Sequence, residues 1–424
     1  MKIFLSYILF FLLGLSSTAQ ARQLQTVAGY EYPFTNRFLA TATAVFMSER
    51  NDFNEKYKLE LEILPNRNDV YLLEGRGTLA FEFFRNTNKM APLIFLLSGF
   101  GGVASSGYLR ETAEFLHDQG FHVITLPSPF NWRFALSAGT QALPGLTEQD
   151  AHDVYRVMQK TLSYVEKKYH ITPKNISLAG FSMGGLHAAF VGKIDNEEKK
   201  IGLTKILLVN PPYSLLYGIQ VLDNMVAISQ KIGAQRTSEL IGAALNLSDD
   251  FKRMIKNPQL LPLIIEKNPF TEDELQVLIG LTMKQPIADV IFMVELLHNF
   301  GVLKTPLSPY NRSLRLEEAQ SFTLSDYVDR VLLPYLNSQS PHKRTFTSLE
   351  NETSMQRIAP TFARDRRMFL IHNADDFTVT EQQLQFLQEQ FGSRATIYPY
   401  GGHMGNLWYK RNQDDILTLL KSLL

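Results

Sequence analysis

A five-residue glycine–serine motif constrains this chain more than any other feature. The sequence G-F-S-M-G at residues 180–184 follows a short apolar run at 176–179, and an apolar helical pattern continues over 186–191. A buried parallel strand has this length and this uninterrupted apolar character. A tight turn brings the strand and helix backbones together, and the two glycines remove the Cβ atoms that would clash there. The pattern therefore predicts a strand–turn–helix that exposes Ser182 as a nucleophilic oxygen.

Strand and helix patterns alternate on both sides of this motif. The helical patterns cover residues 107–117 and 147–168. The strand patterns, each short and rich in apolar residues, lie at 57–63, 78–84, 92–97, 121–126, 176–179, 205–209, 368–372 and 395–398. This alternation is typical of βαβ units, so we expect a mainly parallel sheet flanked by helices.

Residues 214–360 break the alternation with several helical patterns and no convincing strand. A capping-box sequence at 271–274 precedes an apolar run, and amphipathic helices are expected at 285–300 and 323–337. We interpret the segment as a helical cap inserted between two core strands. Inserts at the carboxyl ends of parallel strands overhang the site there, so the cap should cover Ser182.

The insertion divides the core into a first part, residues 22–213, and a second part, residues 361–424. Two interpretations are open for the apolar stripe in the cap: its side chains line an acyl pocket, or they form the cap's own core. We expect the core for most of the four residues Met225, Phe292, Met293 and Leu297.

Two further motifs follow the last two predicted strands. The strand at 368–372 runs into N-A-D-D-F-T-V at 373–379, and the strand at 395–398 is followed by Y-G-G-H-M-G-N at 400–406. A carboxylate just beyond a strand end can reach a histidine on the next loop. His403, alone in a glycine-rich loop, is placed where a general base can reach over the serine.

These motifs, in the order serine, acid, histidine, resemble those of the α/β-hydrolase superfamily, over most of residues 80–213 and 361–424. The resemblance is to serine hydrolases of the esterase and lipase type. It implies that Ser182 is the nucleophile, that His403 is the general base and acid, and that a carboxylate orients His403.

The family's spacing selects the carboxylate. Counting three residues on from the small turn residue Asn373, or three back from Val379, gives Asp376. Asp375 is the runner-up. Some members of the family carry the acid one strand earlier, where Asp223 is the nearest candidate.

An oxyanion hole needs two N–H donors. One is the backbone N–H of Met183, the residue after the nucleophile. The strand at 92–97 ends in S-G-F-G-G at 98–102, where the family often has His-Gly, and the resemblance implies that Phe100 supplies the second N–H. Serine in place of histidine matters little, because the donor is backbone. The loop lacks the full G-x-G-x-x-G and the lysine of a phosphate-binding loop.

The expected chemistry needs these three residue types and no cofactor. A serine hydroxyl is a weak nucleophile until a base removes its proton, and histidine titrates near working pH. The carboxylate fixes the imidazole tautomer and stabilises the imidazolium. The other histidines show no metal-ligand spacing, and the chain has no cysteine, so no metal site is expected.

Composition and the N-terminus bear on location and partners. With 42 basic and 42 acidic side chains, the chain has no general electrostatic attraction to nucleic acid or anionic membranes. Lys2, the apolar run 3–15 and A-Q-A at 19–21 predict a secretory signal peptide over residues 1–21. No cysteine follows, which excludes lipoprotein processing. We expect an exported protein, periplasmic or secreted, with no membrane span after signal removal because no later window is expected to reach transmembrane length.

The sequence thus predicts an exported serine hydrolase that cleaves an ester or related acyl bond of a small molecule through an acyl-enzyme. A peptidase or an acyltransferase would use the same triad, and a non-catalytic binding protein would use the same fold. Nothing in the sequence indicates the oligomeric state.

Overall fold

The structure, a computed structural model, describes residues 24–47, 56–65, 67, 73–255, 265, 266 and 268–421. The segment 1–21, predicted to be a signal peptide, lies outside the described residues.

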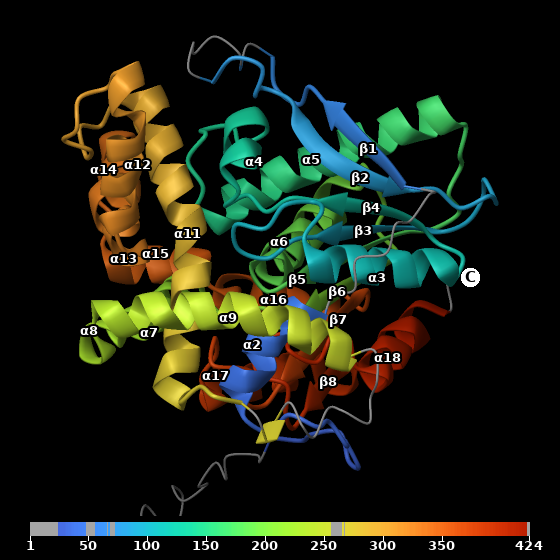
Figure 1. Cartoon of the computed structure of the whole chain (residues 1–424). Helices are drawn as coiled ribbons and strands as arrows, with labels where there is room; N and C mark the ends of the chain where they lie inside the picture. Colours follow the sequence, from blue (N-terminus) through green and yellow to red (C-terminus); the bar gives the residue numbers. More distant parts are fainter. Residues whose placement is uncertain are drawn as a thin grey trace, which may run out of the picture.

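An eight-stranded sheet forms the centre of the molecule (Figure 1), in the order β1-β2-β4-β3-β5-β6-β7-β8. β1 and β2 are antiparallel to their neighbours, and the strands from β4 to β8 in that order are parallel. Every predicted strand is present, with its ends shifted by at most a residue or two, so the prediction of a mainly parallel sheet is confirmed. The strands are β1 (Lys56–Leu61), β2 (Leu79–Phe84), β3 (Leu93–Leu97), β4 (His122–Leu126), β5 (Ile176–Phe181), β6 (Lys205–Val209), β7 (Met368–Asn373) and β8 (Ala395–Tyr398).

Helices cover both faces of the sheet, because its central strands are apolar on both sides. On one face, Phe95 and Leu178 belong to the same buried cluster as side chains of α5 (Thr147–Tyr169), α6 (Met183–Glu198) and α17 (Glu381–Phe391). On the other face, Ile94 and Leu207 pack in a second cluster with α3 (Gly107–Asp118) and α18 (Lys410–Leu420). A short helix, α4 (Trp132–Ser137), follows β4.

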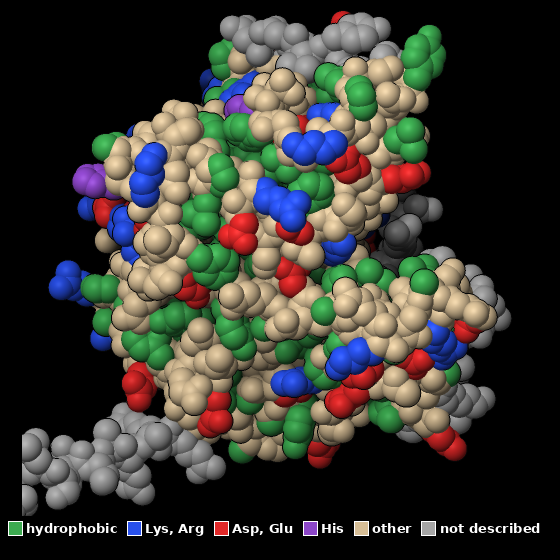
Figure 2. Space-filling view, turned by 90° about the vertical axis from the view of Figure 1, so that its left-hand side faces the viewer, with side chains coloured by type: hydrophobic (Ala, Val, Ile, Leu, Met, Phe, Trp, Pro, Cys, Tyr) green, Lys and Arg blue, Asp and Glu red, His purple; other side chains and the backbone are tan. Residues whose placement is uncertain are grey.

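The described part of the chain between β6 and β7 contains helices joined by loops and no strand, and Figure 1 shows its larger helices gathered beside the sheet. Seen from that side, positive and negative side chains are interspersed with hydrophobic ones (Figure 2). The limits 214–360 of a separate cap unit stay a prediction. The elements are α7 (Leu215–Ala227), α8 (Ser229–Ile232), α9 (Ala234–Ile255), α11 (Glu272–His298), η3 (Pro309–Asn311), α12 (Arg312–Ser321), α13 (Leu324–Tyr327), η4 (Val328–Leu332), α14 (Leu333–Ser338), α15 (Phe346–Thr353), η5 (Met355–Ile358) and α16 (Ala359–Arg364); η6 (Gly392–Arg394) precedes β8.

The long helix α11 corrects two expectations. The predicted capping box is present, with the Thr271 hydroxyl accepting from the N–H of Glu274, but the helix then runs through Pro286 instead of starting anew at 285. An 18-residue stretch of α11 has a mean hydropathy of 1.6, enough by length and composition to cross a membrane, so the expectation that no later window would reach that length was wrong. Half of that stretch is buried inside the protein, where α11 packs against α7, α12 and α2 as the central helix of the segment.

An N-terminal helix that the sequence analysis did not predict, α2 (Arg37–Met47), lies among C-terminal elements (Figure 1). It packs on α9 and α11. Phe38 stacks on Phe377 with ring centroids 5.8 Å apart, and just before α2 Tyr30 stacks on Tyr398 at 4.7 Å. The first described residues of the chain therefore complete the C-terminal half of the fold.

Candidate active site

Ser182 lies at the turn between β5 and α6 in a conformation that side chains rarely adopt, with φ 53° and ψ −123°. A Cβ on Gly180 would lie 2.1 Å from the carbonyl oxygen of Gly184, and a Cβ on Gly184 would lie 2.4 Å from the carbonyl oxygen of Leu97. Only glycine fits at these two positions, so the spacing recognised in the sequence has a steric cause.

His403, in the loop after β8, connects Ser182 to Asp376. Its Nε2 lies 2.7 Å from the Oγ of Ser182, and its Nδ1 lies 2.9 Å from one carboxylate oxygen of Asp376. Because a carboxylate only accepts, Nδ1 carries the proton, and Nε2 is left to accept from the serine hydroxyl. The exposed fractions of Ser182, His403 and Asp376 are only 9%, 4% and 3%, so little water competes for these hydrogen bonds.

Asp376 is buried, and several hydrogen bonds stabilise its carboxylate. Thr378 donates to it from both its N–H, at 2.9 Å, and its hydroxyl, at 2.8 Å, and the side-chain amide of Asn210 donates at 2.9 Å. Burial opposes ionisation of this carboxyl, but the charge of His403 and its hydrogen bond outweigh burial and lower the pKa of Asp376 to about 2. A carboxylate in this state holds the imidazole in one tautomer.

The two alternative acids, Asp375 and Asp223, make other contacts. Asp375 accepts from the backbone N–H groups of Gly401, at 3.3 Å, and Gly402, at 2.9 Å, and so shapes the loop that carries the histidine. Burial raises the pKa of Asp375 to about 6. Asp223 accepts from the first N–H groups of α13, at 3.0 and 2.8 Å. Of the three candidates, Asp376 is the one that contacts the imidazole.

The loop after β3 lies directly against the serine, since a Cβ on Gly99 would be 3.1 Å from the Cβ of Ser182. Tyr108 fixes the loop by accepting from the N–H of Gly99 at 2.8 Å. Within the described residues, neither Phe100 nor Met183 donates its backbone N–H to another protein group. Two N–H donors beside the nucleophile are what an oxyanion hole requires.

Helix α2 supports the histidine loop, which the sequence analysis missed. The hydroxyl of Thr41 accepts from the backbone N–H of His403 at 2.8 Å. A Cβ on Gly402 would lie 2.1 Å from the carbonyl oxygen of Arg37, and one on Gly405 would lie 2.4 Å from that of Ala40. The glycines of this loop were a signal of close backbone approach, but they did not show which segment approaches.

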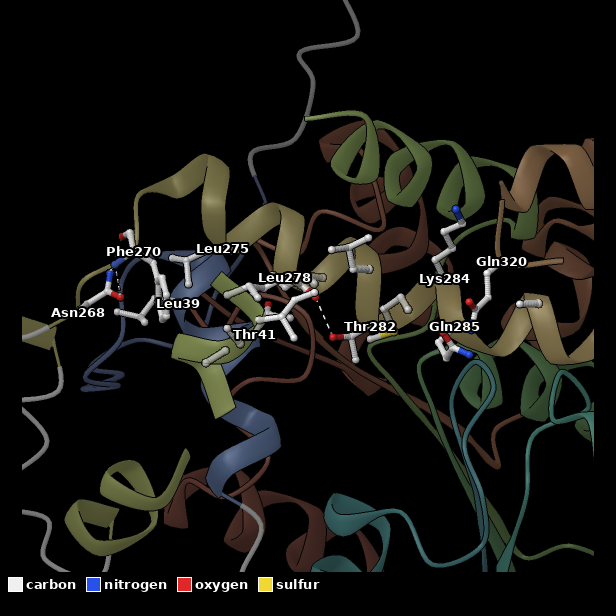
Figure 3. Close-up of a pocket in the computed structure, with 17 residues that line it drawn as sticks. Leu39, Thr41, Asn268, Phe270, Leu275, Leu278, Thr282, Lys284, Gln285 and Gln320 are labelled. Carbon is white, nitrogen blue, oxygen red and sulfur yellow. Dashed lines mark hydrogen bonds between the residues drawn. The ribbon is translucent and has the colours of Figure 1, made fainter. Parts of the chain in front are cut away.

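A cavity of about 560 Å³ lies between α2, α9 and α11 (Figure 3). Phe270 and Leu39 lie at one end, Leu278 and Thr41 lie nearer the middle, and Lys284 and Gln320 lie at the other end. Thr41 thus contributes both to this cavity and to the histidine loop. The full lining is Leu39, Thr41, Ala42, Ile241, Ala244, Asn268, Phe270, Leu275, Leu278, Ile279, Leu281, Thr282, Met283, Lys284, Gln285, Ala288 and Gln320.

A second cavity, of about 200 Å³, shares lining residues with the first and lies at the loop after β3. Thr282 and Gln285 line both cavities, and Gly101 lines the second. The four apolar residues considered from the sequence line neither: Met225 and Met293 are buried in the core clusters, and Phe292 and Leu297 pack against one of them. These residues therefore pack in the core rather than line a cavity, but both clusters also contain residues outside 214–360, so a core belonging to the cap alone stays a prediction.

The fold is identified by its strand order and by the places of three residues: the strained serine follows β5, the acid follows β7 and the histidine follows β8. The chain has the α/β-hydrolase fold. Among the described residues, no group of three or more His, Asp or Glu side chains is arranged to hold a metal ion.

No protein-family model and no curated protein matches the chain. Among solved structures it is similar to esterase B from Lactobacillus rhamnosis, with 14% identity, 91% of this chain and 90% of that chain covered, and a TM-score of 0.39. It is also similar to a hyperthermophilic esterase from the archaeon Pyrobaculum calidifontis, with 12% identity, coverage of 91% and 90%, and a TM-score of 0.42. A bacterial membrane phospholipase A has 13% identity, coverage of 100% and 99%, and a TM-score of 0.40. Similarity at this level says nothing about activity or substrate, so a proposed reaction depends on the geometry of the site.

Proposed function

We propose that this protein is a serine hydrolase that cleaves an ester or related acyl bond through an acyl-enzyme. One observation carries the proposal: the continuous chain of hydrogen bonds from the Oγ of Ser182 through both ring nitrogens of His403 to Asp376. A serine buried in an ordinary turn has no need of a strained backbone, an imidazole and an ionised carboxylate in line.

In the proposed reaction, His403 takes the hydroxyl proton at Nε2 as the Oγ of Ser182 attacks the acyl carbon. The N–H groups of Phe100 and Met183 stabilise the oxyanion, and Asp376 stabilises the imidazolium. The imidazolium then protonates the leaving group, and the acyl group remains on the serine. Water, deprotonated by the same imidazole, attacks the acyl-enzyme and releases the acid.

The larger cavity supports an aliphatic acyl group as the part of the substrate held by the protein. Most of the residues that line it are apolar, and Thr41 connects it to the histidine loop. An alkyl chain gains about 0.8 kcal/mol per CH₂ group when it is buried in such surroundings. We therefore favour an ester with an aliphatic acyl chain as the substrate.

A fluorophosphonate probe tests the nucleophile, because it reacts with serines activated in this way. We expect the probe to label the wild-type protein at Ser182 and to leave Ser182→Ala unlabelled. Ser321→Ala, an exposed serine at the end of α12, is the matched control and should be labelled like the wild type. Equal labelling of Ser182→Ala and the wild type would refute the proposal.

We also propose that the protein is exported, from the signal pattern in residues 1–21. N-terminal sequencing of the mature protein from a cell-envelope or culture-medium fraction should begin at residue 22. A chain recovered only from the cytoplasm, with its N-terminus intact, would contradict export.

A further inference from the structure

The smaller cavity, beside the loop after β3, is lined by a residue whose carboxyl group the reaction above does not use. This cavity lies between the loop at Gly101, the residues around the start of α4 and the helix α11. Asp289 of α11 lines it and is half-buried. Gly101 directly follows Phe100, so this cavity adjoins the loop that carries one of the expected oxyanion donors.

Asp289 differs from the other partly or fully buried carboxyl groups of its helix. Glu274 accepts from Arg236 at 2.8 Å, and Glu295 pairs with Arg315 at 3.3 Å. In the part of the chain that the structure describes, Asp289 has no hydrogen bond or ion pair. Burial raises the pKa of Asp289, and no neighbouring cation offsets it. A carboxylate left without a partner in a partly dry cavity is costly, which favours a cationic partner supplied from outside.

The rest of the cavity is also suited to a cation. The aromatic residues Phe130 and Trp132 line it, and aromatic rings attract ammonium groups. Gln285 has no hydrogen-bond partner among the described residues, so its carbonyl oxygen is free to accept. Among the described residues, no lysine or arginine lines this cavity; Lys284, on the same stretch of α11, lines the larger one.

We propose that the cavity lined by Asp289, Phe130 and Trp132 binds a cationic group of the substrate, an ammonium or quaternary ammonium. This inference depends on the proposed function: with the acyl chain in the larger cavity, the smaller one receives the leaving alcohol. The substrate class is then an ester of an amino alcohol, with an aliphatic acyl chain on one side of the reacting carbon and a positive charge on the other.

A pair of substrates that differ only in charge tests the inference. An acylthiocholine and the 3,3-dimethylbutyl thioester of the same acid have the same shape, with N⁺ replaced by carbon. The protein contains no cysteine, so the thiol that is released can be measured without background. We expect the wild type to have a higher kcat/KM for the cationic ester, by roughly tenfold for a partly desolvated cation.

Asp289→Asn should lower the cationic-to-neutral ratio of kcat/KM by roughly tenfold, chiefly through KM of the cationic ester. Asp329→Asn removes an exposed carboxylate in η4, which does not line the cavity, and should leave the ratio unchanged. A wild type with no preference for the cation, or an Asp289→Asn variant that keeps the preference, overturns the inference.

Direct binding separates this inference from the proposed function. Calorimetric titration with phenyltrimethylammonium should show binding to the wild type and a loss of roughly tenfold in affinity in Asp289→Asn. If neither thioester is cleaved but this binding is observed, the hydrolase proposal fails and the cation site stands. If neutral esters are cleaved and no binding is detected, the cation site fails alone.

Discussion

Two adjacent aspartates, Asp375 and Asp376, lie in opposite electrostatic surroundings. Asp376 faces His403 and receives further hydrogen bonds from Thr378 and Asn210, so its ionised form is stabilised. Asp375 is half-buried, accepts from two backbone N–H groups and pairs with no cation of the described residues, so burial raises its pKa to about 6. Two carboxylates that are neighbours in sequence therefore differ in role: one contacts the imidazole, and the other holds the loop that carries it.

The first prediction follows from this difference. Asp376→Asn should lower kcat by about a thousandfold or more, since an amide cannot hold the same tautomer and cannot stabilise the imidazolium. Asp375→Asn keeps an oxygen that can accept from Gly402 and should lower kcat by less than about tenfold. Steady-state kinetics on one p-nitrophenyl ester compares the two variants. A larger loss in Asp375→Asn than in Asp376→Asn would show that the acid is misassigned.

The second prediction concerns stability against pH. The pKa of Asp375 is raised from 3.8 to about 6 on folding, so between these values the folded state binds more protons than the unfolded state. The contribution of Asp375 is therefore present below about pH 4 and is lost as pH rises to about 6, by at most about 3 kcal/mol and by less where water screens the group.

Asp376 acts in the opposite sense and in another window. Its pKa is lowered to about 2, so its contribution is present above pH 3.8 and is lost as pH falls towards 2. Urea unfolding from pH 4 to 6.5 covers the window of Asp375 and not that of Asp376, and the difference between the wild type and Asp375→Asn removes the other groups that titrate there. We expect the free energy of unfolding of the wild type to fall relative to Asp375→Asn as pH rises. Parallel curves for the two proteins would contradict the raised pKa.

At this scale, the sequence was sufficient where a local pattern carried the chemistry. Ser182, Asp376 and His403 each follow a strand, and a glycine or turn residue at a set distance marks each of them, so their convergence could be predicted. Thr41 could not, because a threonine within a helix is common and its contact with His403 joins residues far apart in the chain. Asp289 carries no local signal either, since its lack of a partner depends on packing between separate helices.

The packing of α2 against the loop 401–405 is an element-scale feature with a steric test. Gly405→Ala would place a Cβ 2.4 Å from the carbonyl oxygen of Ala40, so the loop or the helix must move and His403 moves with it. We expect kcat to fall by roughly a hundredfold, as for other small displacements of a catalytic group.

Gly218→Ala is the matched control, because its Cβ would meet only Pro212, at 3.9 Å, and it lies within α7. This variant should retain the wild-type kcat. Fluorophosphonate labelling rates and thermal unfolding of both variants separate a displaced base from a loss of folding. Wild-type labelling of Gly405→Ala would mean that α2 does not position the histidine.

The helix α11 is the element that the sequence misjudged. The sequence predicted a helix over 285–300 and not one continuous with the capping box at 271–274, although a proline inside a helix removes a backbone donor and crowds the preceding turn. In the structure the helix passes through Pro286, and a Cβ on Gly101 would lie 2.1 Å from the Cγ of that proline. The proline thus packs against the loop after β3, a contact between distant segments that periodicity cannot reveal.

The same helix forms a wall of the larger cavity, which leads to a prediction about the acyl chain length of the substrate. Leu278→Trp would fill part of the cavity, while Leu314→Trp changes an exposed leucine of α12 that does not line it. On p-nitrophenyl esters of increasing acyl length, Leu278→Trp should shift the optimum to shorter chains and lower kcat/KM for the longest by tenfold or more. An unchanged profile would show that the acyl chain lies elsewhere.

At the scale of the whole molecule, the N-terminal segment is part of the C-terminal half of the fold. Tyr32, Phe34 and Phe38 are buried in one cluster with residues of α7, α11 and the acid loop. The sheet could be predicted because each strand is a short apolar run that can be recognised from its own sequence. The path of residues 24–47 could not, since its anchoring contacts are aromatic pairs such as Tyr30 with Tyr398.

This arrangement predicts that activity depends on a segment remote from the triad in sequence. A chain that begins at residue 24 should be labelled by fluorophosphonate like the full chain. A chain that begins at residue 48 loses α2 and with it the acceptor for the N–H of His403, and each buried aromatic that it lacks costs about 2 kcal/mol or more. We expect this chain to be labelled at least a hundredfold more slowly and to unfold at a lower temperature.

Adding back a peptide of residues 24–47 distinguishes lost support from general misfolding. If α2 acts by packing against a preformed core, the peptide should bind the shortened chain and restore part of the labelling, in proportion to its occupancy. A Thr41→Val peptide should bind with similar affinity through its apolar face but restore labelling less, because it cannot accept from the N–H of His403. A shortened chain that is labelled at the full rate without any peptide would show that the catalytic histidine needs no support from the N-terminal segment.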